Sequence, residues 1–326
     1  MSLPADLERR LRLPVIAAPM FLGSGPDLVT EVCRAGMVGT FPALNARTSG
    51  GYEAWLAEIA QRLSTHPDAA PFGVNLIVHT SNRRLDADLE ITVRNRVPIV
   101  ITSLGAARHV VDAVHAYGGL VLHDVINLRH AHKAAEAGVD GIVAVSAGAG
   151  GHGGTMSPFA LVSEIREFFG GMIVLSGAIS RGADVLAARA MGADLAYIGT
   201  RFLAAAESLV SEEQKQMMVA SSAADILYTP SISGVNANFM RQSLTRVGLD
   251  PDNLPEHGKL DMHNEAKAWK TVWSAGQGVG AIKAIVPAAE LCAQLVTEYS
   301  EALGRIRSDR FAQTGAAAQH AESAAS

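Results

Sequence analysis

The chain has 326 residues, of which 48% are hydrophobic and 18% are charged, and its formal net charge is −5. This length and apolar content allow a large buried core and exclude disorder for most of the chain. No basic cluster stands out, so the composition does not favour a nucleic-acid partner. The two cysteines, Cys33 and Cys292, lack the CxxC spacing of a zinc or redox site.

The N-terminal residues 1–10 include acidic side chains, and no long apolar run follows them, so they predict no signal peptide. Nowhere does the sequence approach the roughly 18 consecutive apolar residues of a membrane-spanning helix. We therefore expect a cytoplasmic protein without membrane contact.

Eight short and mostly apolar runs are typical of parallel strands that are covered on both faces. The runs are Val15–Met20, Val38–Pro42, Phe72–Val78, Ile99–Ser103, Leu120–Val125, Gly141–Ser146, Met172–Gly177 and Leu195–Gly199. Helical patterns alternate with them, at Asp27–Ala35, Tyr52–Ser64, Arg83–Arg96, Ala106–Tyr117, Leu128–Ala137, Pro158–Phe169 and Ala183–Met191.

Glycine follows several of these helices, as in Ala35-Gly36 and Ala137-Gly138, where it accepts the left-handed conformation that ends a helix. Strand, helix and glycine recur through eight units. This pattern predicts an α/β protein with a closed (β/α)8 TIM barrel rather than an open doubly wound sheet.

The pattern changes after Phe202. Residues 204–279 predict a mainly helical subdomain that is inserted after strand eight and lies over the barrel mouth. A long helix over about residues 280–307 then supplies the eighth barrel helix, so that residues 1–203 and 280–311 form the barrel domain. Residues 312–326 are mainly Ala, Ser, Gln and Gly and predict a disordered tail.

In TIM barrels the active site lies where the strands end and the βα loops begin. Strand one ends in Ala18-Pro19-Met20, where the proline shapes the backbone below a flat ligand or simply starts a loop. Asn75 is an amide in an apolar run, so it needs partners, either backbone groups or the edge of a heterocycle. Ser103 ends strand four, where a turn explains a hydroxyl equally well.

Strand five ends in His123-Asp124. Neighbouring strand residues point to opposite faces, so a hydrogen-bonded structural histidine is favoured over a metal pair. No further histidine or carboxylate cluster lies nearby, and we predict no metal site.

The loop after strand six, residues 146–155, consists almost entirely of Gly, Ala and Ser around His152. Dense glycine lets the backbone approach a ligand closely, and a histidine there can act as a base or as a hydrogen-bond donor. The alternative is a flexible surface loop with an incidental histidine, which its place at a barrel strand end argues against.

Strands seven and eight end in Ser176-Gly177-Ala178 and Gly199-Thr200-Arg201. The loops after these strands commonly bind phosphate through backbone N–H groups. Tight packing of turn against helix is the alternative. The residues by themselves predict a phosphate-anchored ligand at the barrel mouth, with a histidine above it.

These segments resemble the nitronate monooxygenase family of FMN-binding TIM barrels, formerly called 2-nitropropane dioxygenases. The resemblance covers residues 13–203 and returns at 273–278. The motifs that carry it are Ala18-Pro19-Met20, Gly73-Val74-Asn75, Gly150-Gly151-His152, Gly192-Ala193-Asp194 and Gly199-Thr200-Arg201-Phe202-Leu203.

The resemblance implies FMN as the cofactor and His152 as the catalytic histidine, acting as a base or as the donor that positions an anionic nitronate. It implies a set of cofactor-binding residues around the ring system and the phosphate: Ala18, Pro19, Met20, Asn75, Ser103, Gly150, Gly151, Ser176, Gly177, Ala178, Gly199, Thr200, Gln277 and Gly278. We expect Phe21, His123 and Tyr228 to line a mostly apolar substrate pocket.

Two positions depart from the family pattern. The family usually has glutamate where this chain has Gly148, which removes a carboxylate that could orient or charge the histidine. It usually has a second glycine at Ala178, where alanine still leaves the N–H available.

The leading hypothesis is oxidation of an alkyl nitronate or nitroalkane by O2, which gives a carbonyl compound and nitrite. The nearest alternative is an FMN-dependent NAD(P)H oxidoreductase acting on an enoyl thioester or a quinone, with Arg241 and Lys267 available for a second set of phosphates. Two others are a flavin-free phosphate-binding lyase or isomerase, and a flavin-binding protein without turnover. The sequence leaves the oligomeric state open, a homodimer included.

Overall fold

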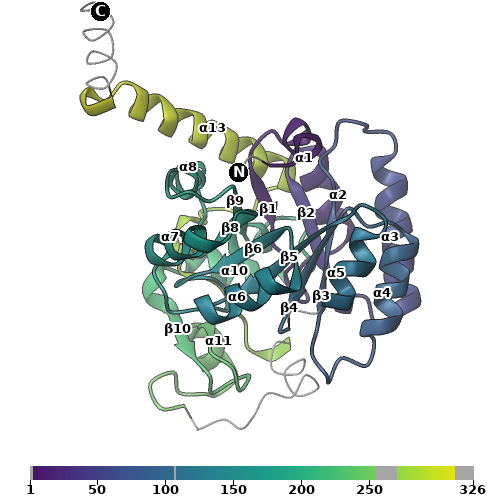
Figure 1. The fold of residues 1–326 in the computed structure, drawn as a ribbon. Helices are drawn as coiled ribbons and strands as arrows, with labels where there is room; N and C mark the ends of the chain where they lie inside the picture. Colours follow the sequence, from purple (N-terminus) through teal and green to yellow (C-terminus); the bar gives the residue numbers. More distant parts are fainter. Residues whose placement is uncertain (1–2, 106–107, 255–269, 313–326) are drawn as a thin grey trace, which may run out of the picture.

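The structure is a computed structural model, and it describes residues 3–105, 108–254 and 270–312. Eight parallel strands close into a barrel in the order β1-β2-β3-β4-β5-β6-β8-β9, with β9 beside β1 (Figure 1). The strands are β1 (Val15–Ala17), β2 (Val38–Pro42), β3 (Gly73–Ile77), β4 (Ile99–Ser103), β5 (Leu120–Val125), β6 (Gly141–Val145), β8 (Met172–Ser176) and β9 (Leu195–Ile198). The predicted TIM barrel is confirmed.

Helices connect successive strands and cover the outside of the barrel (Figure 1). They are α2 (Pro26–Arg34), α3 (Ser49–Leu63), α4 (Leu85–Arg94), α5 (Arg108–His115), α6 (Leu128–Ala137), α7 (Pro158–Phe168) and α8 (Gly182–Ala190), with the short η1 (Ala43–Asn45) before α3 and α9 (Thr200–Leu203) after β9. Each helix from α2 to α8 starts and ends within three residues of its predicted bounds, because local periodicity and glycine stops define it well, whereas η1 and α9 were not predicted.

The eighth barrel helix is α13 (Ala288–Arg307), which packs against α8 and α2. The prediction that it begins near residue 280 is wrong. Pro287 directly precedes the helix, and a residue before proline is disfavoured in helical conformation, so the helix cannot run back through it. Residues Gln277–Ala281 instead form a separate 3-10 turn, η3.

The interior of the barrel holds its own apolar cluster, distinct from the core between the strands and the helices. Leu3 and Leu7 belong to this interior cluster. Leu7 lies on α1 (Ala5–Arg10), a short helix that the sequence analysis did not predict. Leu7 packs with the other side chains of the interior cluster, so α1 covers the end of the barrel lumen at which the strands begin.

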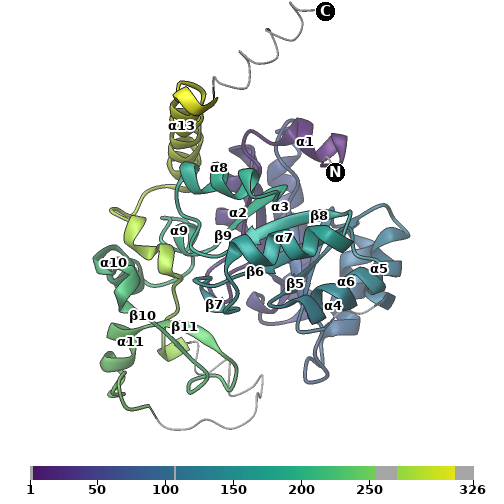
Figure 2. The ribbon, with the colours of Figure 1, turned by 60° about the vertical axis from the view of Figure 1, so that its left-hand side comes forward.

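The segment after the barrel strands contains α10 (Glu212–Ala220), η2 (Ala223–Asp225), α11 (Arg241–Arg246) and two antiparallel strands, β10 (Ile226–Thr229) and β11 (Ala237–Met240). Strand β11 also pairs with β7 (Gly151–His152), which lies in the loop after β6 (Figure 2). The prediction of a mainly helical subdomain missed this three-stranded sheet, because four-residue strands carry little local signal. The domain boundaries stay predictions, and the predicted tail from residue 313 onward lies outside the described residues.

None of the helices in the described ranges is both long and apolar enough to cross a bilayer.

Candidate active site

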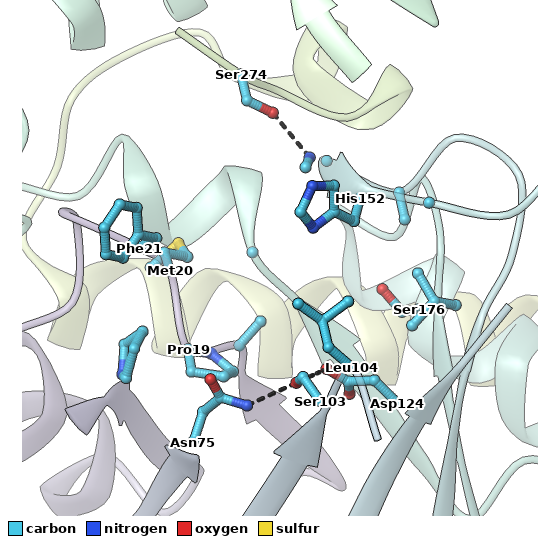
Figure 3. A pocket seen from close by; sticks show the side chains of 18 of the residues that line it. Pro19, Met20, Phe21, Asn75, Ser103, Leu104, Asp124, His152, Ser176 and Ser274 are labelled. Carbon is cyan, nitrogen blue, oxygen red and sulfur yellow. Dashed lines mark hydrogen bonds between the residues drawn. The ribbon is translucent and has the colours of Figure 1, made fainter. Parts of the chain in front are cut away.

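A large cavity opens at the carboxyl-terminal ends of the barrel strands (Figure 3). Its volume of about 2190 Å³ exceeds the roughly 300–1,000 Å³ of a pocket for one small ligand. Gln277 does not line it; its backbone N–H instead donates to the Gly148 carbonyl at 2.9 Å. The other predicted site residues do line the cavity: Ala18, Pro19, Met20, Phe21, Asn75, Ser103, His123, Gly150, Gly151, His152, Ser176, Gly177, Ala178, Gly199, Thr200, Tyr228 and Gly278.

The floor of the cavity is polar, in contrast to the apolar lumen below it. Asn75 on β3, Ser103 on β4 and Asp124 on β5 face the lumen, since Ile101 and Leu122, two positions earlier on β4 and β5, lie in the interior cluster. Asn75 Nδ2 donates to Ser103 Oγ at 2.7 Å, and the Ser103 hydroxyl donates to Asp124 Oδ2 at 2.5 Å (Figure 3). Three neighbouring strands therefore contribute one hydrogen-bonded network.

Two buried polar atoms at this floor have no hydrogen-bond partner among the described residues. Asp124 Oδ1 and the Tyr197 hydroxyl make no hydrogen bond within the part of the chain that the structure describes. Burial raises the pKa of Asp124 to about 6, against the lowering effect of the Ser103 hydrogen bond. Burial, and after it the charge of Asp124, raise the pKa of Tyr197. Unsatisfied buried groups that line a cavity are suited to bind a polar ligand.

Asp124 and Tyr197 are not among the site residues predicted from the sequence. For Asp124 a signal was present, because Leu120, Leu122 and Asp124 share one face of β5 and the first two are apolar. Tyr197 lies in an apolar strand, where an aromatic residue ordinarily signals core packing. That its hydroxyl has no hydrogen-bond partner among the described residues is visible only in the tertiary structure.

His123 lies on the opposite face of β5 from Asp124. Its Nδ1 is 2.7 Å from Thr102 Oγ1, a residue that also faces away from the lumen. Burial, followed by the charge of His130 on α6, lowers the pKa of His123 to about 4. The ring is therefore neutral and hydrogen-bonded on the helix side of the barrel wall, although His123 is among the residues that line the cavity.

His152 lies on a loop that the following segment holds in place. Its strand β7 pairs with β11, where His152 stands opposite Ala237. The Gly151 N–H donates to Ser274 Oγ at 2.7 Å, and the Ser274 hydroxyl donates to the Asn238 carbonyl at 2.5 Å. Figure 3 shows the imidazole directed into the cavity above the polar floor. The surface-loop interpretation of this segment does not fit these contacts.

Two further side-chain hydrogen bonds fix the ends of this loop. Asn238 Nδ2 donates to the Ala149 carbonyl at 2.6 Å, and the Tyr228 hydroxyl donates to the Gly153 carbonyl at 2.8 Å. Tyr228, expected to line the substrate pocket, therefore also supports the backbone next to His152.

The ends of β8 and β9 form a cradle of backbone donors. In the described part of the chain four N–H groups there donate to no protein acceptor: those of Gly177, Ala178, Gly199 and Thr200. Ser180 Oγ is buried beside them without a hydrogen-bond partner in the described residues, and it lines the cavity. A Cβ added at Gly177 would overlap Ser146 Oγ, so a side chain there is excluded. This set of donors fits a phosphate group.

Backbone strain gathers at the cavity. Leu22, Leu104 and Ala178 line it, and their φ angles are 61°, 61° and 54°, in the left-handed region that L residues rarely adopt. Such conformations persist only where the surrounding structure enforces them, and they cluster at functional sites.

Gly148 also has a left-handed backbone, with a φ of 83°. A Cβ at this position would lie 2.9 Å from Gln277 Oε1 and 3.2 Å from the Ala178 Cβ. The local conformation and the closeness of η3 therefore explain why this chain has glycine there, and the loop supplies no carboxylate to His152.

The family model described as nitronate monooxygenase matches residues 8–298 of the chain. The protein belongs to the nitronate monooxygenase family. Members of this family are FMN-dependent oxidoreductases, and the resemblance seen in the sequence is thereby confirmed.

The chain is also similar to individual proteins and to solved structures. A nitronate monooxygenase of Paraburkholderia phytofirmans is 28% identical, over 90% of this chain and 94% of its own length. The solved nitroalkane oxidase of Streptomyces ansochromogenes is 25% identical, with a TM-score of 0.79 over 92% of this chain and 99% of its own. FabK from Thermotoga maritima shares the fold, with a TM-score of 0.76 at 23% identity over 93% and 97% of the two chains.

Within the described ranges, no group of three or more His, Cys, Asp or Glu side chains is placed to hold a metal ion.

Proposed function

We propose that this protein binds FMN and oxidises alkyl nitronates or nitroalkanes with O2 to a carbonyl compound and nitrite. The observation that carries the proposal is the position of His152, held by β11 over a cavity whose far side offers a cradle of free backbone donors. Bound there, FMN would accept the electrons of the substrate and pass them to O2.

The donor cradle would hold the phosphate of FMN. Gly177, Ala178 and Thr200 would donate their backbone N–H groups, and Ser180 would add its buried hydroxyl. Because the neighbouring strands and the enforced left-handed backbone at Ala178 hold these groups in place, phosphate binding costs little reorganisation. Asn75 and the Ala18-Pro19-Met20 turn would then lie against the ring system above the barrel lumen.

His152 would bind the substrate. Its imidazole would donate a hydrogen bond to the negatively charged nitro group of a nitronate and so hold the carbon that is oxidised in one orientation. With a neutral nitroalkane, the same ring would first accept the proton of the carbon atom next to the nitro group. Phe21 and Tyr228 would supply walls that keep water from the reacting carbon.

A second candidate, an FMN-dependent NAD(P)H oxidoreductase, is favoured by the size of the cavity, which leaves room for a second large molecule beside FMN. Arg246 and Lys270 also line it. Arg241, one of the expected phosphate ligands, pairs with Asp252, and Lys267 lies outside the described residues. Membership of an FMN-dependent family argues against a flavin-free lyase or isomerase.

Anaerobic mixing of the FMN-loaded protein with either an alkyl nitronate or NADH tests the proposal. We expect the nitronate to bleach the flavin absorbance within the mixing experiment and NADH to leave it unchanged. Rapid bleaching by NADH with none by the nitronate would move the assignment to the reductase.

In the same experiment the His152→Ala protein should retain FMN but lose at least about 100-fold in the rate of bleaching by nitronate, the usual contribution of a positioned acid or base. His66→Ala, on the exposed surface, is the matched control and should behave as wild type. Full activity of His152→Ala would remove the role assigned to this histidine.

A further inference from the structure

The carboxyl group of Asp124 has no part in the nitronate chemistry described above, yet it lines the same cavity. Its Oδ2 accepts the Ser103 hydroxyl, while its Oδ1 is buried without a hydrogen-bond partner within the described chain. An ionised carboxylate with an unpaired, buried oxygen is costly, so this atom is a site at which a proton is readily held.

Among the residues that the structure describes, no cation compensates the charge of Asp124. Its titration is set by burial and by the Ser103 hydroxyl, and no lysine or arginine in the described residues contributes to it. The titratable group coupled to it from β9 is Tyr197, and His152 on β7 faces it across the cavity (Figure 3). His123, its neighbour on β5, faces the helices, and Asn75 on β3 does not ionise.

We infer that Asp124 takes up a proton on Oδ1 when the flavin in this cavity is reduced and releases it when the flavin is oxidised again. The inference rests on the proposed binding of FMN. When bound, FMN would take two electrons from the nitronate, whose carbon gains the oxygen of a water molecule as nitrite leaves. Of the two protons that this releases, one would join the ring system, which would then carry a negative charge. A new negative charge in the cavity disfavours the neighbouring carboxylate, so Asp124 forms an O–H bond with a second proton from solvent.

O2 would take two electrons and two protons to give hydrogen peroxide: the ring system would lose one proton and its negative charge, and solvent would supply the other proton. The Oδ1–H bond of Asp124 would then break and its proton would return to solvent. Asp124 thereby keeps the net charge of the cavity floor nearly constant through the cycle. It acts as the group that couples the redox state of the cofactor to pH, since a charge near a flavin ring tunes the electronics of that ring.

The test is the midpoint potential of the bound flavin between pH 5 and pH 9, measured by spectroelectrochemistry in wild type and in Asp124→Asn. Each proton taken up in a two-electron reduction changes the equilibrium constant tenfold per pH unit, which is about 30 mV. Above pH 6 we expect wild type to take up one proton more per flavin than Asp124→Asn does. Equal slopes of the midpoint potential against pH in the two proteins would overturn the inference.

Ser103→Ala supplies a second variant, because the lost hydrogen bond favours the protonated form of Asp124. The pH range of extra proton uptake should then begin at a higher pH than in wild type. Infrared redox-difference spectra should show a protonated carboxyl band on reduction at pH 7, in wild type and in the exposed control Asp86→Asn but not in Asp124→Asn. The absence of this band in wild type would also overturn the inference.

These outcomes separate the two proposals. If wild type takes up no FMN, the proposed function fails. If wild type takes up FMN and reacts with nitronate, but its proton uptake equals that of Asp124→Asn, the role of Asp124 alone is refuted.

Discussion

Two adjacent residues at the end of β8 determine whether the donor cradle can form. Gly177 has a φ of 136° and its absent side chain leaves room for Ser146, whereas Ala178 is an alanine held at a φ of 54°. The left-handed conformation costs an L residue roughly 1–2 kcal/mol. The backbone at 177 and 178 is therefore kept in place by its surroundings, and it turns two N–H groups toward the cavity.

Replacing these residues should separate steric fit from strain. We expect Gly177→Ala to weaken FMN binding at least about tenfold, because the new Cβ overlaps Ser146 Oγ and displaces both N–H groups. Fluorescence titration of FMN measures this loss. Ala178→Gly is the matched control and should retain its FMN affinity. Relief of the left-handed strain slightly outweighs the greater freedom of glycine in the unfolded chain, so the free energy of unfolding should rise by about 0.5 kcal/mol. An unchanged affinity of Gly177→Ala for FMN would contradict the role of the donor cradle in binding the phosphate.

At the scale of elements, the sheet β10-β11-β7 joins the segment after the barrel to the loop that carries His152. Ser274 sits at the centre of this junction, where its hydroxyl accepts from the Gly151 N–H and donates to the Asn238 carbonyl. One side chain therefore satisfies backbone groups of both β7 and β11. Loss of such a bridge leaves those groups unpaired.

Ser274→Ala should consequently disturb the placement of His152 more than the binding of FMN. We expect kcat/KM for a nitronate to fall about tenfold, equivalent to about 1.4 kcal/mol, within the cost of an unsatisfied buried group. The Kd of FMN should change less than twofold, because the cradle lies on β8 and β9. Ser300→Ala, which removes an exposed hydroxyl on α13, controls for general effects. Equal losses in FMN affinity and in turnover would indicate collapse of the whole site instead.

At the scale of the whole molecule, two groups on the two faces of β5 give stability opposite dependences on pH. The pKa of Asp124 is raised from 3.8 to about 6, so stability is lost as pH rises between these values. The pKa of His123 is lowered from 6.5 to about 4, so stability is lost as pH falls through that range. The two contributions partly cancel between about pH 4 and 6.

Asp124→Asn should therefore reveal the contribution that the carboxyl makes. Between pH 5 and pH 8, the free energy of unfolding of wild type without FMN should fall by about 1.4 kcal/mol more than that of the variant. This is the effect of one pH unit, from pH 5 to about pH 6, in which this aspartate is ionised in the unfolded chain and protonated in the folded protein. Urea unfolding of both proteins at the two pH values measures the difference, and His123 contributes equally to each. A difference that does not change with pH would show that Asp124 ionises as in the unfolded chain.

The barrel could be predicted from the sequence, because each strand, each helix and each terminating glycine is a local pattern that repeats through eight units. The sequence also determined which segments meet at the mouth of the cavity, since the ends of parallel strands converge there. The start of α13 was missed although Pro287 marked it, because the apolar periodicity continues upstream.

How the site is supported and charged depends on tertiary contacts, which the sequence does not show. The pairing of β7 with β11 joins residues more than 80 positions apart through strands too short to signal themselves. Whether the carboxyl of Asp124 finds a partner depends on the side chains of neighbouring strands, not on its own segment. Hydrogen-bond satisfaction is a property of the assembled interior, and for that reason no local pattern could predict it.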